Sequence, residues 1–182
     1  MSRGSENPVT PKFHSEEEDA MKIPKTSRQS IDNVLAQKRF AMVGISRSPR
    51  EFSMALFDEL CRRGYEVVPV TPYMPQVKGR RCFARVQDIQ PPVEGALLMT
   101  SPNVTDEVVR DCAEAGVKRI WMYSAGGKGA VSDGAVSYCL GKGIEVVPGE
   151  CPFMFLHEAG AIHGLHGFVR KIIGSYPRRQ AA

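Results

Sequence analysis

A short stretch of the chain combines residue types that suit an anionic ligand. The sequence AMVGISRSPREFS, residues 41–53, begins apolar, reaches Gly44, and then becomes polar and basic with Ser46, Arg47 and Arg50. A glycine lets the backbone approach a ligand closely, and a guanidinium offers a planar set of donors to a phosphate. The pattern predicts that a phosphate binds where a short strand gives way to a helix.

The dinucleotide-binding fingerprint is only partly present in this stretch. It requires G-x-G-x-x-G and an acidic residue about 20 positions later for a ribose hydroxyl. Here Gly44 is followed by Ser46 and Pro49 at the other two glycine positions, and Thr71-Pro72 stands where the acid is expected. Binding of NAD or FAD is therefore disfavoured, although a nicotinamide-linked oxidoreductase stays open as an alternative.

Five apolar segments separated by helical patterns are expected to position these residues. The strands are predicted at 39–45, 65–72, 95–102, 118–124 and 144–149. Helices are predicted at 27–38, 53–64, 105–116 and 131–143, and the first three have Ser30, Ser53 and Thr105 as expected caps. Alternation of this kind predicts an α/β fold, a Rossmann-like doubly wound parallel sheet of about five strands in a single domain.

Composition agrees with one globular domain. The chain has 182 residues, of which 42% are hydrophobic, and a formal net charge of +4. Its expected organisation is a flexible N-terminal arm at 1–27, a ligand-binding domain at 28–156, and a C-terminal helix with a basic tail at 157–182. The mild positive charge gives little reason to expect a nucleic-acid partner.

The cysteines and the hydropathy of the chain limit where the protein is expected to act. Five cysteines are scattered without a C-x-x-C pair, which argues against a zinc site or a disulfide framework and favours a cytoplasmic location. No apolar run reaches the ~18 residues of a membrane span, so no membrane partner is expected. A homodimer stays open.

Several segments resemble the CoA-binding domain proteins, which are small Rossmann-like proteins similar to the CoA-binding domain of the succinyl-CoA synthetase α subunit. The segments are VGISRSP, VTPYMPQVKGRRCF, TSPNVTDEVVRDCAEAGVKRIWMYSAGG and GIEVVPGECPFMFL, and together they span about residues 30–156. The resemblance implies a coenzyme A or acyl-CoA ligand and no established reaction. Nothing corresponds to the phosphohistidine domain of that subunit, so ligase activity is not implied.

Two strand ends depart from the pattern of that family. Many relatives carry Asn-Pro where this chain has Thr71-Pro72, and a Gln-Pro-Gly-Ala type of turn where it has Tyr123-Ser124-Ala125-Gly126-Gly127. In an open parallel sheet, ligands bind outside the carboxyl ends of the strands. The residues at these ends and the nearby cations form the predicted cofactor-binding set: Gly44, Ile45, Ser46, Arg47, Arg50, Thr71, Pro72, Lys78, Thr100, Ser101, Pro102, Val104, Ser124, Gly126, Glu150 and Cys151.

The strand ends lack paired carboxylates or a Ser/His/Asp triad, so no catalytic residue is predicted. The favoured interpretation is a protein that binds coenzyme A through a βα-loop phosphate site without catalysis of its own. The alternatives are a nicotinamide-linked oxidoreductase, an acyl-CoA-using transferase, or an interaction protein on a ligand-free fold.

Other residues have two possible roles. Cys151 is interpreted either as a buried small side chain or as a partner for the CoA thiol. Tyr73 and Trp121 are expected to pack rather than stack on a ligand, and a metal is not expected at His157, His163 and His166.

Overall fold

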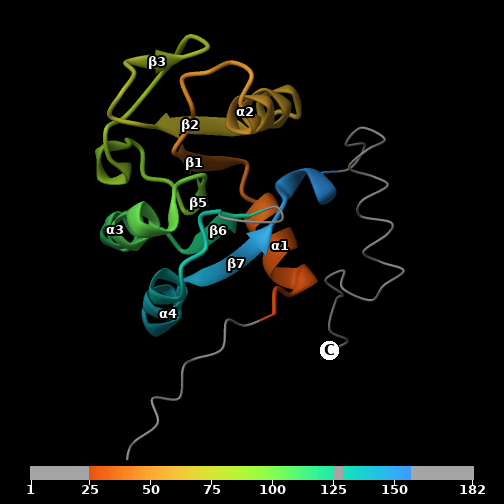
Figure 1. Ribbon diagram of the computed structural model, residues 1–182, viewed down its shortest axis with the longest axis vertical. Helices are drawn as coiled ribbons and strands as arrows, with labels where there is room; N and C mark the ends of the chain where they lie inside the picture. Colours follow the sequence, from red (N-terminus) through yellow and green to blue (C-terminus); the bar gives the residue numbers. More distant parts are fainter. Residues whose placement is uncertain (1–24, 125–128, 157–182) are drawn as a thin grey trace, which may run out of the picture.

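The strands follow the apolar segments of the sequence. The computed structural model describes residues 25–124 and 129–156. Its main sheet is parallel in the order β2-β1-β5-β6-β7 (Figure 1). The strands are β1 (Arg39–Val43), β2 (Glu66–Val70), β5 (Gly95–Leu98), β6 (Arg119–Tyr123) and β7 (Glu145–Glu150). The predicted α/β doubly wound sheet is confirmed.

Helices cover both faces of this sheet, and the side chains of β1 show how they are divided. Phe40 and Met42 belong to the core that α1 (Arg28–Leu35) and α2 (Phe52–Arg62) cover. Ala41 and Val43 point the other way, because side chains alternate along a strand, and belong to the core under α3 (Pro102–Glu114) and α4 (Asp133–Gly141). Figure 1 shows α3 and α4 across the sheet from α1.

Shorter elements follow β2 and β7. The strands β3 (Gln76–Val77) and β4 (Arg80–Arg81) form an antiparallel hairpin beyond β2, and η1 (Val86–Asp88) follows it (Figure 1). The turn η2 (Pro152–Met154) follows β7. No helix in the described ranges is long and apolar enough to cross a membrane.

Three helix starts differ from the prediction. Ser27, not Ser30, caps α1, because its Oγ accepts a hydrogen bond of 3.0 Å from the backbone N–H of Ser30. Helix α3 begins three residues early, at Pro102, since a proline at the first helical position gives up no intrahelical bond. Thr105, the predicted cap, is fully buried inside α3 and donates to the carbonyl of Ser101.

The start of α2 differs in a way that affects the candidate site. Glu51 occupies the cap position without a side-chain bond to the helix, and Ser53 lies in the first turn. The predicted cap, Ser53, instead holds the loop that precedes the helix, as described below.

The strand order places a topological switch beside β1. The chain proceeds from β1 to β2 on one side and to β5, β6 and β7 on the other. The loops that leave β1 and β5 therefore diverge to opposite faces of the sheet. In open α/β sheets, ligands bind in the crevice that this divergence creates at the carboxyl ends of the strands.

Candidate functional site

A hollow of about 230 Å³ opens at this point of the sheet. We call it the switch-point hollow, and it is lined by Gly44, Ser46, Glu51, Phe52, Ser53, Met99, Thr100, Tyr123 and Gly129. Its residues come from the loops after β1, β5 and β6 and from the first turn of α2. Three residues of the predicted binding set therefore lie together here, namely Gly44, Ser46 and Thr100.

Gly44 is required by the fold of the protein itself. Its φ is +87°, and a Cβ at this position would lie 3.0 Å from the carbonyl carbon and oxygen of Met99. The sequence suggested that the glycine makes room for a ligand. The structure shows that it first makes room for the backbone that follows β5, and its own N–H donates to the carbonyl of Val70 at 3.3 Å.

Two serines order the loop after β1. The backbone N–H of Ser46 donates to Oγ of the buried Ser53 at 3.0 Å, which ties the loop to α2. The backbone N–H of Ser48 donates to Oγ of Ser46 at 3.1 Å. Because the Ser46 hydroxyl accepts this bond, its own proton can be donated to another group.

The first turn of α2 adds donors to the same hollow. The amides of Met54 and Ala55 donate to the carbonyl of Glu51, whereas those of Phe52 and Ser53 precede the first possible intrahelical acceptor. The positive end of the helix dipole also favours an anion at this point. The carboxylate of Glu51 opposes that preference, because it brings a negative charge to the same rim.

Aromatic rings form the opposite wall. The rings of Phe52 and Tyr123 stack with centroids 4.7 Å apart, and Phe153 meets Phe52 edge-on at 5.4 Å. Burial, and to a lesser degree the neighbouring Cys151, raises the pKa of the Tyr123 hydroxyl. Tyr123 is therefore a neutral hydrogen-bonding group near pH 7.

Arg47, in the loop after β1, contacts Tyr73, in the loop after β2. The guanidinium carbon of Arg47 lies 5.6 Å from the ring centroid of Tyr73. Tyr73 is 73% exposed and so is not packed as expected, whereas Trp121 is 1% exposed and packs as expected. An exposed ring with a cation over it offers a surface on which another planar group can stack.

Four predicted residues point away from the open part of the site. The side chain of Ile45 is buried in the core under α1 and α2, and Glu150 and Cys151 are each 6% exposed. Thr71 is also buried, and its Oγ1 accepts from the backbone N–H of Tyr73 at 3.3 Å. None of the four lines the switch-point hollow.

The other predicted residues that the structure describes do not line the hollow either. Lys78 is exposed and pairs with Asp58 at 3.2 Å. Pro102 is the first residue of α3, and Ser124 is half-buried after β6. Four others are exposed, namely Arg50, Pro72, Ser101 and Val104. Gly126 and the three histidines at 157, 163 and 166 lie outside the described residues.

Sequence reasoning missed six residues that line the hollow: Glu51, Phe52, Ser53, Met99, Tyr123 and Gly129. A signal existed for Ser53, which was assigned to a helix cap. Only a glycine fits at position 129, because a Cβ there would overlap the carbonyl of Tyr123. In the part of the chain that the structure describes, no cluster of three or more His, Cys, Asp or Glu side chains could hold a metal.

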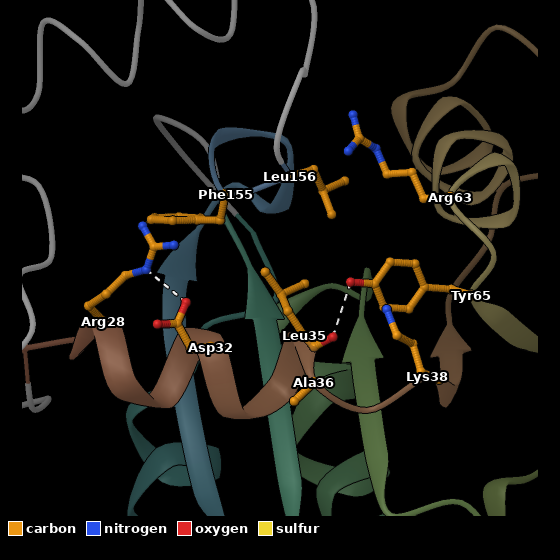
Figure 2. A pocket seen from close by; sticks show the side chains of 9 residues that line it. All are labelled: Arg28, Asp32, Leu35, Ala36, Lys38, Arg63, Tyr65, Phe155 and Leu156. Carbon is orange, nitrogen blue, oxygen red and sulfur yellow. Dashed lines mark hydrogen bonds and ion pairs between the residues drawn. The ribbon is translucent and has the colours of Figure 1, made fainter.

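A second, larger cavity lies elsewhere. It measures about 410 Å³ and is bounded by α1, the end of α2 and the residues after η2. We call it the α1–α2 pocket. Its lining residues are Arg28, Asp32, Leu35, Ala36, Lys38, Arg63, Tyr65, Phe155 and Leu156 (Figure 2).

Comparison with known proteins gives one family and several structural relatives. The model of the family described as "CoA binding domain" matches residues 38–157. A solved structure of a hypothetical protein from Pyrococcus horikoshii OT3 is 28% identical, with a TM-score of 0.63, and the match covers 68% of this chain and 85% of that one.

Curated relatives are much longer than this chain. The α subunit of an acetate–CoA ligase [ADP-forming] II from Pyrococcus furiosus is 25% identical over 97 residues, which are 53% of this chain and 21% of that subunit. An acetate–CoA ligase [ADP-forming] from Methanocaldococcus jannaschii is 24% identical over 89 residues, which are 49% of this chain and 13% of the ligase. The chain thus matches about a fifth or less of these proteins.

Proposed function

The chain belongs to the CoA binding domain family, and we propose that it binds coenzyme A or an acyl-CoA at the switch-point hollow. The observation that carries the proposal is the position of the hollow. It lies at the carboxyl ends of the strands where the order reverses, and backbone donors and a serine hydroxyl line it. The family match spans all of these residues, since it covers 38–157.

The diphosphate of the ligand is assigned to the first turn of α2. The amides of Phe52 and Ser53 have no intrahelical acceptor, and the hydroxyl of Ser46 can donate beside them. Ser53 holds the Ser46 amide at 3.0 Å, so the loop is already ordered before the ligand arrives. A site of this kind loses little conformational entropy on binding.

The adenosine end is assigned to the exposed pair of Arg47 and Tyr73. Their arrangement, with the guanidinium carbon 5.6 Å from the ring centroid, gives a planar surface for adenine and a cation for a phosphate. Arg50 is exposed on the same loop and supplies a second cation. Coenzyme A carries a 3′-phosphate that NAD lacks, so these cations favour coenzyme A.

The pantetheine arm is assigned to the wall formed by Thr100, Tyr123 and Phe52. This wall combines a stacked aromatic pair with a hydroxyl group, which suits a chain of alternating amide and methylene groups. Cys151 is 6% exposed and does not line the hollow. A mixed disulfide between Cys151 and the CoA thiol would therefore require local opening of the chain.

We propose that binding occurs without catalysis. Among the described residues that line the hollow, Glu51 supplies the one carboxylate, and the pKa of Tyr123 is raised by burial. These two groups do not form the acid–base pair that acyl transfer requires. The proposal also leaves out the ligase reaction of the longer relatives, because this chain matches only a small part of each.

Native mass spectrometry of the purified protein tests the proposal. Addition of coenzyme A should give a 1:1 complex, and dephospho-CoA should bind at least about tenfold more weakly, since a charge-assisted hydrogen bond contributes roughly 1.5–3 kcal/mol. Release of free CoA from added acetyl-CoA, above the rate in buffer, would show that the protein is catalytic. Equal binding of coenzyme A and dephospho-CoA would show that the cations of the proposed site do not contact the 3′-phosphate.

A further inference from the structure

Thr100, which lines the switch-point hollow, has a hydrogen-bonding partner inside the protein. Its Oγ1 lies 2.7 Å from Oγ1 of Thr105, a residue that is fully buried in α3. Oγ1 of Thr105 also donates to the carbonyl of Ser101 at 3.0 Å. The three groups therefore form a short chain of hydrogen bonds where the loop after β5 enters α3.

The direction of this chain of hydrogen bonds follows from the protons that are present. A hydroxyl has one proton to donate and two lone pairs that accept, whereas a carbonyl only accepts. Because the proton of Thr105 goes to the Ser101 carbonyl, the bond between the two threonines uses the proton of Thr100. The reverse assignment makes one hydrogen bond fewer, since the Thr105 proton cannot serve both contacts.

Thr100 is therefore an acceptor toward the hollow. Its proton is engaged by Thr105, so the lone pairs of its oxygen are what the hydroxyl offers to a ligand. Its methyl carbon is packed as well, because it lies 3.1 Å from the position that a Cβ at Gly44 would take. The two contacts together oppose a rotation of the side chain that would turn the proton toward a ligand.

The α2 side of the same hollow has the reverse character. The hydroxyl of Ser46 accepts a backbone bond and keeps its own proton for a ligand, and the amides of Phe52 and Ser53 precede the first intrahelical acceptor. These groups are donors, although the carboxylate of Glu51 stands at the rim beside them. The hydroxyl of Tyr123 can donate or accept, so it does not discriminate. The hollow thus favours ligand acceptors on the α2 side and a ligand donor at Thr100.

We propose that Thr100 accepts a hydrogen bond from an amide N–H of the pantetheine arm and selects ligands that carry a donor at this point. The inference rests on the proposed binding of coenzyme A at the switch-point hollow. Phosphate oxygens are acceptors and suit the α2 side, whereas the secondary amides of pantetheine carry N–H groups that can donate. Thr100 thereby sets the direction of the ligand, with the diphosphate at the start of α2 and an amide in the loop after β5.

Two isosteric variants of the full chain separate the acceptor from the buried threonine pair. Thr100→Val removes both the pair and the acceptor, whereas Thr105→Val removes the same pair but leaves the Thr100 oxygen in place. In isothermal titration calorimetry, Thr100→Val should weaken CoA binding about three- to tenfold, the range expected for one neutral hydrogen bond. Thr105→Val should melt lower but bind coenzyme A within about twofold of the unchanged chain. Equal losses of affinity in the two variants would overturn the proposal.

A fragment of the ligand locates the contact. Adenosine 3′,5′-bisphosphate lacks the pantetheine arm, so its affinity should be the same for the unchanged chain and for Thr100→Val. An equal loss for this fragment and for coenzyme A would place Thr100 at the adenosine end and contradict the proposal. Failure of the unchanged chain to bind coenzyme A would instead contradict the proposed function, which keeps the two failures apart.

The last experiment changes the ligand, so it remains informative if Thr100→Val folds poorly. In CoA analogues, an ester oxygen replaces the N–H of each pantetheine amide in turn, which exchanges a donor for an acceptor. One such analogue should bind the unchanged chain about tenfold more weakly than coenzyme A does. The difference should shrink in Thr105→Val, where the proton of Thr100 is free to donate. Equal binding of coenzyme A and every ester analogue would overturn the proposal, because no ligand donor would then meet Thr100.

Discussion

The switch-point hollow and the α1–α2 pocket differ in size, composition and origin. The switch-point hollow measures about 230 Å³ and is made of loop backbone, a helix start and small or aromatic side chains. The α1–α2 pocket measures about 410 Å³ and is made mainly of helix side chains, with three cations and one carboxylate. The family match covers all of the first but not the α1 residues of the second.

This difference shows why size alone is a poor guide to a binding site. A parallel sheet with a reversal in its strand order creates a crevice that its own secondary structure cannot fill. We therefore assign the ligand to the smaller cavity.

The largest expected effect concerns Gly44. Gly44→Ala should destabilise the protein by about 2–4 kcal/mol and abolish CoA binding, because the new Cβ meets the Met99 backbone at 3.0 Å and φ is +87°. Gly64→Ala is the matched control, since Gly64 has a φ of +81° and nothing within 4 Å of an added Cβ. It should cost only about 1–2 kcal/mol. Chemical denaturation measures both, and equal losses would show that the approach to Met99 is unimportant.

Removing single cations should separate the two cavities. Arg47→Ala should weaken CoA binding by about tenfold or more, because the residue is proposed to contact the ligand from an exposed loop. Lys38→Ala removes a cation that also lies over a tyrosine ring, but at the α1–α2 pocket, and it should leave CoA binding unchanged. Isothermal titration calorimetry gives both affinities. A larger loss of CoA affinity in Lys38→Ala than in Arg47→Ala would indicate that coenzyme A binds in the α1–α2 pocket.

Removing the charge of Glu51 is expected to strengthen CoA binding, not to weaken it. Its carboxylate lines the switch-point hollow close to the proposed position of the diphosphate. Glu51→Gln should therefore strengthen CoA binding by a few-fold, with a larger effect at low salt, because like charges repel. Asp32→Asn, the corresponding change at the α1–α2 pocket, should leave the affinity for CoA as it was. Weaker binding by Glu51→Gln would indicate that the carboxylate contacts the ligand favourably.

The smallest expected effect depends on pH. Hydrogen bonds from Arg62, and then from Arg63, lower the pKa of Glu59 to about 2. Because the pKa is lower in the folded protein, Glu59 contributes stability above the ordinary carboxyl pKa of 4.5 and loses it as the pH falls toward 2. Glu59→Gln should lower the melting temperature by about 1–3 °C at pH 7 and by less at pH 3. CoA binding should not change.

The sheet could be predicted from the sequence because apolar segments and helical spacing decide its order of elements. The positions of strand ends were less accurate: β5 ends at Leu98, and residues up to 102 were included in the prediction. The end of a strand is hard to place from the sequence when the apolar pattern changes to polar residues gradually. The start of α3 at Pro102 shows how a turn signal and a helix start can be the same residue.

The sequence pointed to the lining of the candidate site only at residues whose type is typical of a phosphate-binding loop. Gly44 and Ser46 belong to the predicted binding set and line the switch-point hollow. The conformation of Gly44 is set by Met99, a contact between loops 55 positions apart that spacing could not reveal. Glu51, Phe52 and Tyr123 were missed because their types do not suggest a phosphate site. The ion pair of Lys78 with Asp58 was not predictable either, since Asp58 lies on a different element, α2.

The most direct test of the account compares cofactors on the unchanged protein. Coenzyme A at a hundredfold excess over Kd should stabilise the folded state by about 2.7 kcal/mol, which corresponds to roughly 5–10 °C in melting temperature. NAD and NADP at millimolar concentration should produce no shift. A shift with NAD or NADP and none with coenzyme A or acetyl-CoA would contradict the assignment of the switch-point hollow to coenzyme A.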